Sequence, residues 1–165
     1  MKVFGLAGWS GAGKTTLIEA LIADLVALDL RVSTMKHAHH SFDLDIPGKD
    51  SHRHRTAGAT EVMVVSAGRW AQIHELRGDP EPGFEELAAR LTPVDLLLVE
   101  GFKRHSHPKL EVHRPSLGKP PLWPEDPEIV AVASDAPLAG LGLPRFDLGH
   151  HRAIAQFILG YVGLG

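Results

Sequence analysis

The chain has 165 residues, a formal net charge of −3 and no cysteine. This length suits one domain with a sizeable core, and the absence of cysteine excludes disulfides and thiolate metal sites. The charge argues against a nucleic-acid partner, and no apolar run is long enough to span a membrane. We therefore expect a single cytoplasmic domain over residues 1–165, with neither a nucleic-acid nor a membrane partner.

The first predicted elements are a buried strand over residues 2–7 and an amphipathic helix over 15–28. The stretch between them fits the phosphate-binding pattern G-x-x-x-x-G-K-[ST]. Its glycines allow positive φ, so that backbone N–H groups and the helix N-terminus face phosphate oxygens. Lys14 would supply a cation to the terminal phosphates, and the Thr15 hydroxyl would bind Mg²⁺. The candidate nucleotide-binding residues are Gly8, Ser10, Gly11, Ala12, Gly13, Lys14, Thr15 and Thr16.

A second strand over residues 31–35 leads into a long polar loop over 36–51, followed by a short helix over 51–56. Loops of this length are uncommon in compact domains unless they are functional, and ligands of open α/β sheets bind at the carboxyl ends of strands. Asp43 and Asp45 are candidate metal ligands, although ordinary loop aspartates would have the same sequence. The basic residues indicate a second anionic group besides the nucleotide: they are Lys36, Lys49, Arg53 and Arg55.

The remaining elements complete an α/β pattern. Two strands separated by a Ser-Ala-Gly turn predict an antiparallel hairpin on an otherwise parallel sheet. Residues 94–99 form a continuous apolar run, typical of a strand buried on both faces. The predicted ranges are strands 61–65, 69–74, 94–99, 110–113, 129–133 and 145–148, and helices 84–91 and 150–162. We expect a phosphate-loop nucleotide-binding fold, with a mostly parallel sheet flanked by helices.

Two acidic residues end buried strands near the predicted phosphate loop. Glu100 is placed to hold magnesium through water or to position an attacking water, and with Lys14 it is a candidate catalytic residue. Asp135 is the candidate for reading guanine, since an aspartate can accept hydrogen bonds from its N1–H and exocyclic amine. The common Asn-Lys-x-Asp pattern is excluded because the chain has no Asn. A turn aspartate before Pro137 would look the same.

The proline-rich stretch over residues 102–127 carries a second basic group: Lys103, Arg104, Lys109, Arg114 and Lys119. This group indicates either another anion contact or a solvated charged face. His105 and His107 are expected at the surface. The eleven histidines, with His37, His39 and His40 close together, also leave a transition-metal site open as an alternative.

Several motifs together resemble one known family. They are Gly-x-Ser-Gly-x-Gly-Lys-Thr-Thr-Leu at 8–17, Lys-His-x-His-His at 36–40 with Asp43, Asp45 and Pro-Gly-Lys-Asp-Ser at 47–51, Ala-Gly-Ala at 57–59, Leu-Val-Glu-Gly-Phe-Lys at 98–103, Pro-Lys at 108–109, and Val-Ala-Ser-Asp at 132–135. In these residues the chain is similar to the molybdopterin-guanine dinucleotide biosynthesis adapter proteins. Residues beyond 137 carry little of this resemblance.

The resemblance implies a homodimeric α/β protein that binds GTP and Mg²⁺, has weak GTPase activity and assists the molybdenum cofactor guanylyltransferase. It implies that Gly11, Gly13, Lys14 and Thr15 hold GTP phosphates and that Thr15 and Glu100 serve magnesium, with Asp43 as a further metal candidate. The basic loop would bind the anionic molybdopterin cofactor or the partner enzyme. The cofactor-binding candidates there are Lys36, His37, His40, Lys49 and Asp50.

Two other functions remain open from the sequence. A metallochaperone GTPase would deliver an ion such as nickel from the histidine-rich loop. A small-molecule kinase would use Asp43 or Glu100 to deprotonate a hydroxyl acceptor.

Overall fold

The computed structural model describes residues 1–38, 42–102 and 105–165. The chain divides into two compact units, and each is described by itself. The larger unit comprises residues 1–37 and 89–165, and the smaller unit comprises residues 38–88. The helix α3 (Phe84–Ala89) lies at the sequence boundary between them.

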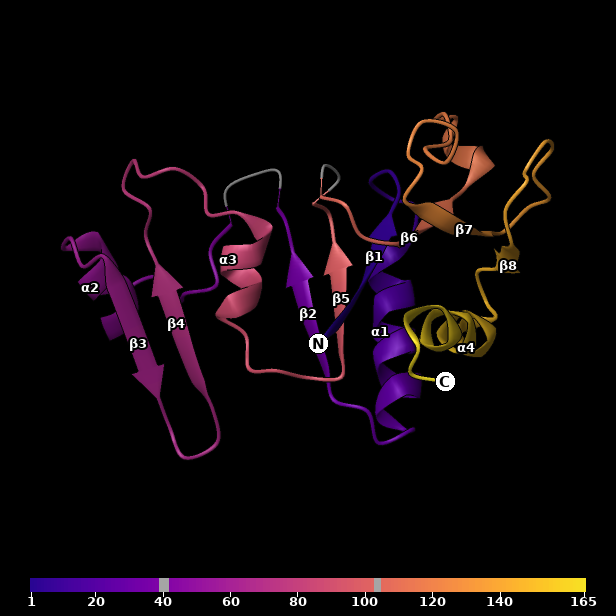
Figure 1. Cartoon of the computed structure of the whole chain (residues 1–165). Helices are drawn as coiled ribbons and strands as arrows, with labels where there is room; N and C mark the ends of the chain where they lie inside the picture. Colours follow the sequence, from indigo (N-terminus) through magenta and orange to yellow (C-terminus); the bar gives the residue numbers. More distant parts are fainter. Residues whose placement is uncertain (39–41, 103–104) are drawn as a thin grey trace. The chain divides into compact units, whose positions relative to one another are not determined.

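The larger unit is built on a six-stranded sheet with strand order β2-β5-β1-β6-β7-β8 (Figure 1). Its neighbouring strands pair in parallel. The strands are β1 (Lys2–Ala7), β2 (Val32–Lys36), β5 (Leu96–Glu100), β6 (Lys109–His113), β7 (Ile129–Ser134) and β8 (Arg145–Asp147). The predicted mostly parallel sheet is confirmed.

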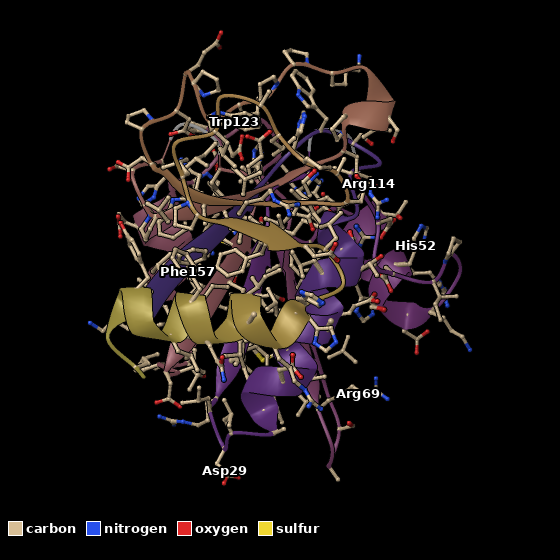
Figure 2. All side chains as sticks on the ribbon, turned by 90° about the vertical axis from the view of Figure 1, so that its right-hand side faces the viewer. Asp29, His52, Arg69, Arg114, Trp123 and Phe157 are labelled. Atoms are coloured by element: carbon tan, nitrogen blue, oxygen red, sulfur yellow. The ribbon has the colours of Figure 1, made fainter. Side chains whose placement is uncertain are left out.

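The helices α1 (Lys14–Val26) and α4 (His151–Val162) pack with one face of this sheet in a common hydrophobic core. Both helices place aliphatic residues one turn apart, so each has an apolar stripe to bury. The buried stripes are Leu17, Ile18, Leu21 and Leu25 on α1 and Ile154, Ala155, Ile158 and Leu159 on α4. Phe157, labelled on α4 in Figure 2, packs against the same core.

Irregular segments cover the opposite face of β7. There Leu122, Trp123 and Leu138 pack with Ile129 and Val132 of the strand. This coverage explains why β7 is a nearly continuous apolar run, since neither face meets water. The element η1 (Pro115–Leu117), a single 3₁₀ turn, begins the irregular stretch after β6.

The smaller unit contains α2 (Asp50–Thr56), β3 (Glu61–Val65) and β4 (Trp70–His74). The strands β3 and β4 pair antiparallel, so the predicted hairpin is confirmed. They form a two-stranded sheet of their own, however, whereas we expected a hairpin on the parallel sheet. No helix in the described ranges is long and apolar enough to cross a membrane.

Candidate functional site

The loop over residues 8–13, which with Lys14 and Thr15 makes up the predicted phosphate loop, connects β1 to α1. Its close approach to β6 requires glycine at position 8, because a Cβ there would lie 2.4 Å from the carbonyl oxygen of Val112. Gly13 caps the N-terminus of α1 in the left-handed region, with φ of 102°. No acidic side chain occupies the first turn of α1, so nothing there offsets the positive end of the helix dipole. Both features suit an anion ligand.

The Lys14 side chain lies across this loop. Its Nζ donates to the carbonyl oxygen of Gly8 at 2.8 Å and to that of Trp9 at 3.0 Å. Thr15 and Thr16 are exposed in the first turn of α1, so the Thr15 hydroxyl is accessible to a ligand. The loop therefore presents an ammonium group and a hydroxyl from one helical turn, the donor set that a magnesium-bound phosphate needs.

Glu100 and Lys36 meet at the carboxyl edge of the sheet. In the strand register Glu100 is the partner of Leu6 on one side and of Lys36 on the other. The Lys36 ammonium lies 3.3 Å from the Glu100 carboxylate, whose side chain is 14% exposed. His37 follows directly and donates its backbone N–H to the Glu100 carbonyl at 2.8 Å. The structure thus brings Lys36, His37 and Glu100 together beside the strand that leads into the phosphate loop.

Asp135 follows β7 and forms an ion pair with Arg114, which is labelled in Figure 2. The Arg114 Nη1 donates to Asp135 Oδ2 at 2.7 Å, and both side chains are 38% exposed. A carboxylate oxygen has two lone pairs, so this bond leaves acceptor capacity on Asp135. The geometry gives the carboxylate a structural partner that the sequence analysis did not assign to it.

In the smaller unit, Arg55 forms ion pairs with Asp43 and Asp45, the aspartates that were candidate metal ligands. Its Nη2 donates to both Asp43 oxygens at 2.9 Å, and its Nε donates to Asp45 at 3.1 Å. Its Nη1 binds Glu75 at 2.5 Å. The pKa of Asp43 is lowered by the backbone N–H of Asp45 and by Arg55, and the pKa of Asp45 is lowered first by the Ser51 hydroxyl. These carboxylates therefore stay ionised, and the metal role of Asp43 stays a prediction.

Lys49 and Asp50 lie at the start of α2, where Lys49 is the N-terminal flanking residue. Both are exposed, and the helix borders a shallow open hollow lined by Gly48, His52, Arg53, Thr56 and Ala57. His40, the remaining candidate of this loop, lies outside the described residues, as does His39. Within residues 1–38, 42–102 and 105–165, no group of three or more His, Cys, Asp or Glu side chains is placed to hold a metal ion.

Buried polar side chains lie on β6 and just before it. His107, which we expected at the surface, is 5% exposed, so that prediction was wrong. Lys109, for which the sequence left an anion contact or a solvated face open, is 2% exposed, which excludes the solvated face. Lys109 pairs with Asp126 at 3.1 Å, and Glu111, fully buried, accepts bonds from the N–H groups of Leu122 and Trp123. Burial raises the pKa of Glu111. Because Lys109 is buried, the second basic group is not a solvated face throughout. Lys103 and Arg104 of this group lie outside the described residues.

Burial also lowers the pKa of His107 to about 4, and the charges of Lys109 and His105 act in the same direction. His105 Nδ1 and His107 Nδ1 lie 2.9 Å apart, so one ring donates to the other. Polar residues alternate with apolar ones along β6, a pattern that is typical of a strand with one face in water. In the structure Lys109, Glu111 and His113 are nevertheless buried, because an irregular segment covers them.

Comparison with known proteins defines the family. Residues 3–135 match the family model described as "MobB: Molybdopterin guanine dinucleotide synthesis protein B". The chain belongs to this family. The MobB family is one of molybdopterin guanine dinucleotide biosynthesis, and the resemblance predicted from the phosphate loop and the polar loop is confirmed.

Curated relatives agree with the MobB assignment. A molybdopterin-guanine dinucleotide biosynthesis adapter protein of Escherichia coli (strain K12) is 39% identical over 162 residues, which cover 96% of this chain and 92% of the relative. One from Haemophilus influenzae is 41% identical over 162 residues, covering 96% of this chain and 88% of the relative. This chain is therefore an adapter protein of the same biosynthesis.

Solved MobB structures share the fold. A crystal structure of a MobB protein homolog from Bacillus stearothermophilus has a TM-score of 0.73 at 26% identity and covers 100% of both chains. The crystal structure of Bacillus subtilis MobB has a TM-score of 0.76 at 22% identity and covers 98% of each chain, which concerns the fold alone.

Proposed function

We propose that this MobB-family chain is a GTP-binding adapter that assists the guanylyltransferase joining GMP to the molybdopterin cofactor. The phosphate loop carries the proposal. Its glycine-capped helix N-terminus and the Lys14 ammonium lie together on one loop and suit the phosphates of a nucleotide. We place this activity in the cytoplasm, where GTP is available.

In this proposal Mg²⁺ is held by the Thr15 hydroxyl and by Glu100, directly or through water. Both groups offer oxygen, the ligand type that magnesium prefers, and β1 and β5 are hydrogen-bonded neighbours. When bound, the ion would neutralise charge on the nucleotide phosphates. Lys36, 3.3 Å from Glu100, orients that carboxylate. An acidic group already engaged by lysine suits a slow GTPase better than a fast one.

The second anionic ligand in this proposal is the molybdopterin cofactor or an acidic surface of the partner enzyme. Lys49 directly precedes α2 and Arg53 lies in its first turn; the Arg53 side chain is 74% exposed and lies 3.9 Å from Asp50. Exposed cations of this kind contact phosphate or carboxylate groups at little desolvation cost. A Lys49→Ala, Arg53→Ala double variant should weaken pterin or partner binding. Unaltered binding of both would reject this assignment.

Homodimer formation belongs to the same proposal. One face of the β3–β4 hairpin carries Met63, Val65 and Trp70, which are 60%, 68% and 61% exposed. Large apolar side chains gathered on one face of a two-stranded sheet favour association, and a hairpin alone is marginally stable. A second copy of the chain would cover this face.

Calorimetric titration with GTP and with ATP, each with Mg²⁺, tests the nucleotide assignment. Wild-type protein should bind GTP in preference to ATP, and Lys14→Ala should lose about a hundredfold or more in affinity for either nucleotide. Asp135→Ala should reduce the preference for GTP if this carboxylate reads guanine. A wild-type preference for ATP would refute the guanine assignment and the proposed function.

A further inference from the structure

Arg114 joins the phosphate loop to the end of β7 within the larger unit. Its Nε donates to the carbonyl oxygen of Ala12 at 2.9 Å, across 102 positions of sequence. Its Nη1 donates to Asp135 at 2.7 Å. Hydrogen bonds from a guanidinium are stronger than those from neutral donors, so both contacts constrain the groups they reach. Arg114 thus holds the loop that contains Ala12 and the end of β7 at Asp135 in a fixed position relative to each other. We expect the nucleotide site to use both segments.

The contact with Ala12 orients the peptide group that precedes Gly13. In a trans peptide the carbonyl and the following N–H point in opposite directions, and the chain has no cis peptide in its described part. Because the Ala12 carbonyl points to Arg114, the Gly13 N–H points to the opposite side of the loop. Phosphate loops bind anions through such N–H groups. Arg114 therefore fixes the orientation of the Gly13 N–H, a group that the predicted phosphate loop would use.

The φ of 102° at Gly13 is one that favours glycine. A Cβ built on Gly13 would lie 3.5 Å from Arg114 Nη2, an ordinary van der Waals distance, so the guanidinium lies beside this residue. Its charge also adds to the positive potential at the start of α1.

The backbone at Arg114 is positioned by the pairing of β6 with β7. It follows β6, where His113 is the register partner of Ser134, the residue before Asp135. Glu111, two residues before His113, anchors the covering segment through the Leu122 and Trp123 N–H groups. That segment returns to the phosphate loop, where the Trp9 indole donates to the Pro120 carbonyl at 2.7 Å. The loop is thus held by two contacts with residues after β6, from Trp9 to Pro120 and from Ala12 to Arg114.

We propose that Arg114 is a positioning residue for phosphate binding, and that Asp135 orients its guanidinium. This inference rests on the proposed nucleotide function but concerns the phosphates and not the base. It assigns Asp135 a role that does not require contact with guanine. The role predicts that loss of Arg114 weakens every ligand that uses the loop, whatever its base.

The test measures the affinities of GTP, ATP and inorganic tripolyphosphate, each with Mg²⁺, for the full chain by calorimetry or by competition. Arg114→Met should lower the affinity for GTP and for tripolyphosphate by a similar factor of about ten to a hundred. Arg114→Lys keeps the charge but cannot make both bonds, so it should restore only a small part of the loss. Arg31→Met is the matched control, because Arg31 also pairs with an aspartate, Asp95, and is 70% exposed.

Asp135→Asn is the second variant, and it keeps the shape of the side chain. If Asp135 acts by orienting Arg114, it should weaken GTP and tripolyphosphate alike, and the double variant with Arg114→Met should lose little more than Arg114→Met alone. Melting temperatures should stay close to that of the wild type, which separates this role from a folding defect. Unchanged tripolyphosphate affinity in a folded Arg114→Met protein would overturn the proposal.

The outcomes also separate this inference from the proposed function. A wild-type protein that prefers ATP but binds tripolyphosphate in an Arg114-dependent way would refute the GTP function and support the inference. Loss of GTP affinity alone in Arg114→Met would place Arg114 at the base and overturn the inference. A wild-type protein that binds none of the three ligands would refute both.

Discussion

The two units of this chain are stabilised by different interactions. Among the described residues, every buried hydrophobic residue except Val62 and Phe84 belongs to the larger unit. The smaller unit instead centres on Arg55, which binds Asp43, Asp45 and Glu75. It also exposes large apolar side chains: Phe42, Leu44, Ile46, Met63, Val64, Val65 and Trp70.

This difference has a physical origin. The larger unit buries a sheet between helices and covering segments, so apolar burial supplies its stability. The smaller unit has the short helix α2, most of the short helix α3 and a hairpin, too little to enclose a core of its own. It therefore relies on charge-assisted hydrogen bonds within the chain and leaves apolar surface for association. Substitutions in one unit should therefore leave the other unit's stability unchanged.

The largest effect is expected in the core of the larger unit. Leu98 is fully buried in the interior strand β5, so Leu98→Ala should lower the free energy of unfolding by about 2–5 kcal/mol. Met63→Ala in the smaller unit is the control, since Met63 is 60% exposed and should change the stability of the monomer by about 0.5 kcal/mol or less. Denaturant unfolding measures both. Equal losses in the two variants would contradict the comparison.

The next effect concerns association. Val65 is 68% exposed on the hairpin, and Val65→Lys should raise the dimer dissociation constant at least tenfold (about 1.4 kcal/mol) without unfolding the larger unit. Sedimentation over a concentration series gives the dissociation constant. Leu28→Lys, at a residue that is 58% exposed in the larger unit, should leave it unchanged. A monomeric wild-type protein at tens of micromolar would argue against a dimer.

A smaller, local effect is expected from Arg55→Met. Removing the guanidinium leaves Asp43, Asp45 and Glu75 without their shared cation, so residues 43–56 should lose protection from hydrogen exchange. The larger unit should keep its protection. Arg53→Met on the same helix is a matched control, since Arg53 is 74% exposed and its contact with Asp50 is 3.9 Å long. Comparable loss of protection in both units would show that their stabilities are not separate.

A further effect is a pH dependence that differs between the units. Burial lowers the pKa of His107 to about 4 from its ordinary value of 6.5, so the unfolded chain takes up a proton more readily. Stability of the larger unit should fall as pH drops from about 6.5 toward 4. The groups facing His107 are His105, Lys109 and Glu128.

The smaller unit should respond at lower pH. The pKa values of Asp43 and Asp45 are lowered from 3.8, so their contribution is present above that value and lost as pH falls below it. Hydrogen exchange between pH 7 and 4.5 should therefore show loss of protection in β6 before the Arg55 cluster. His107→Gln should flatten the pH dependence of the larger unit. An equal slope in wild type and His107→Gln would contradict this origin.

Local sequence patterns predicted much of the fold. The bounds of β1 and β3 agree with the predicted strands, because apolar runs and flanking turn residues mark them clearly. The meeting of Lys36 and Glu100 was also predictable, since adjacent parallel strands end at one edge of the sheet.

The remaining features depend on contacts that no local pattern encodes. The strand β6 alternates charged and apolar residues, which predicts a solvated face, but a segment anchored on Glu111 covers its polar residues. The bond from Arg114 to Ala12 joins positions 102 apart, so neither neighbourhood indicates it. The separation of the hairpin into its own sheet depends equally on long-range pairing.

The contact between Trp9 and Pro120 has a practical consequence. The Trp9 indole sits within the phosphate loop, donates to Pro120 and lies 5.8 Å from the Lys119 ammonium. A charge at this distance from an indole shifts the wavelength of its fluorescence emission. Ligands that displace Lys119 and Pro120 should therefore shift the emission maximum of Trp9. With Trp70 and Trp123 both replaced by phenylalanine, Trp9 is the one tryptophan left of the three in the sequence, and ligand binding at the loop could be followed by its fluorescence without an attached dye.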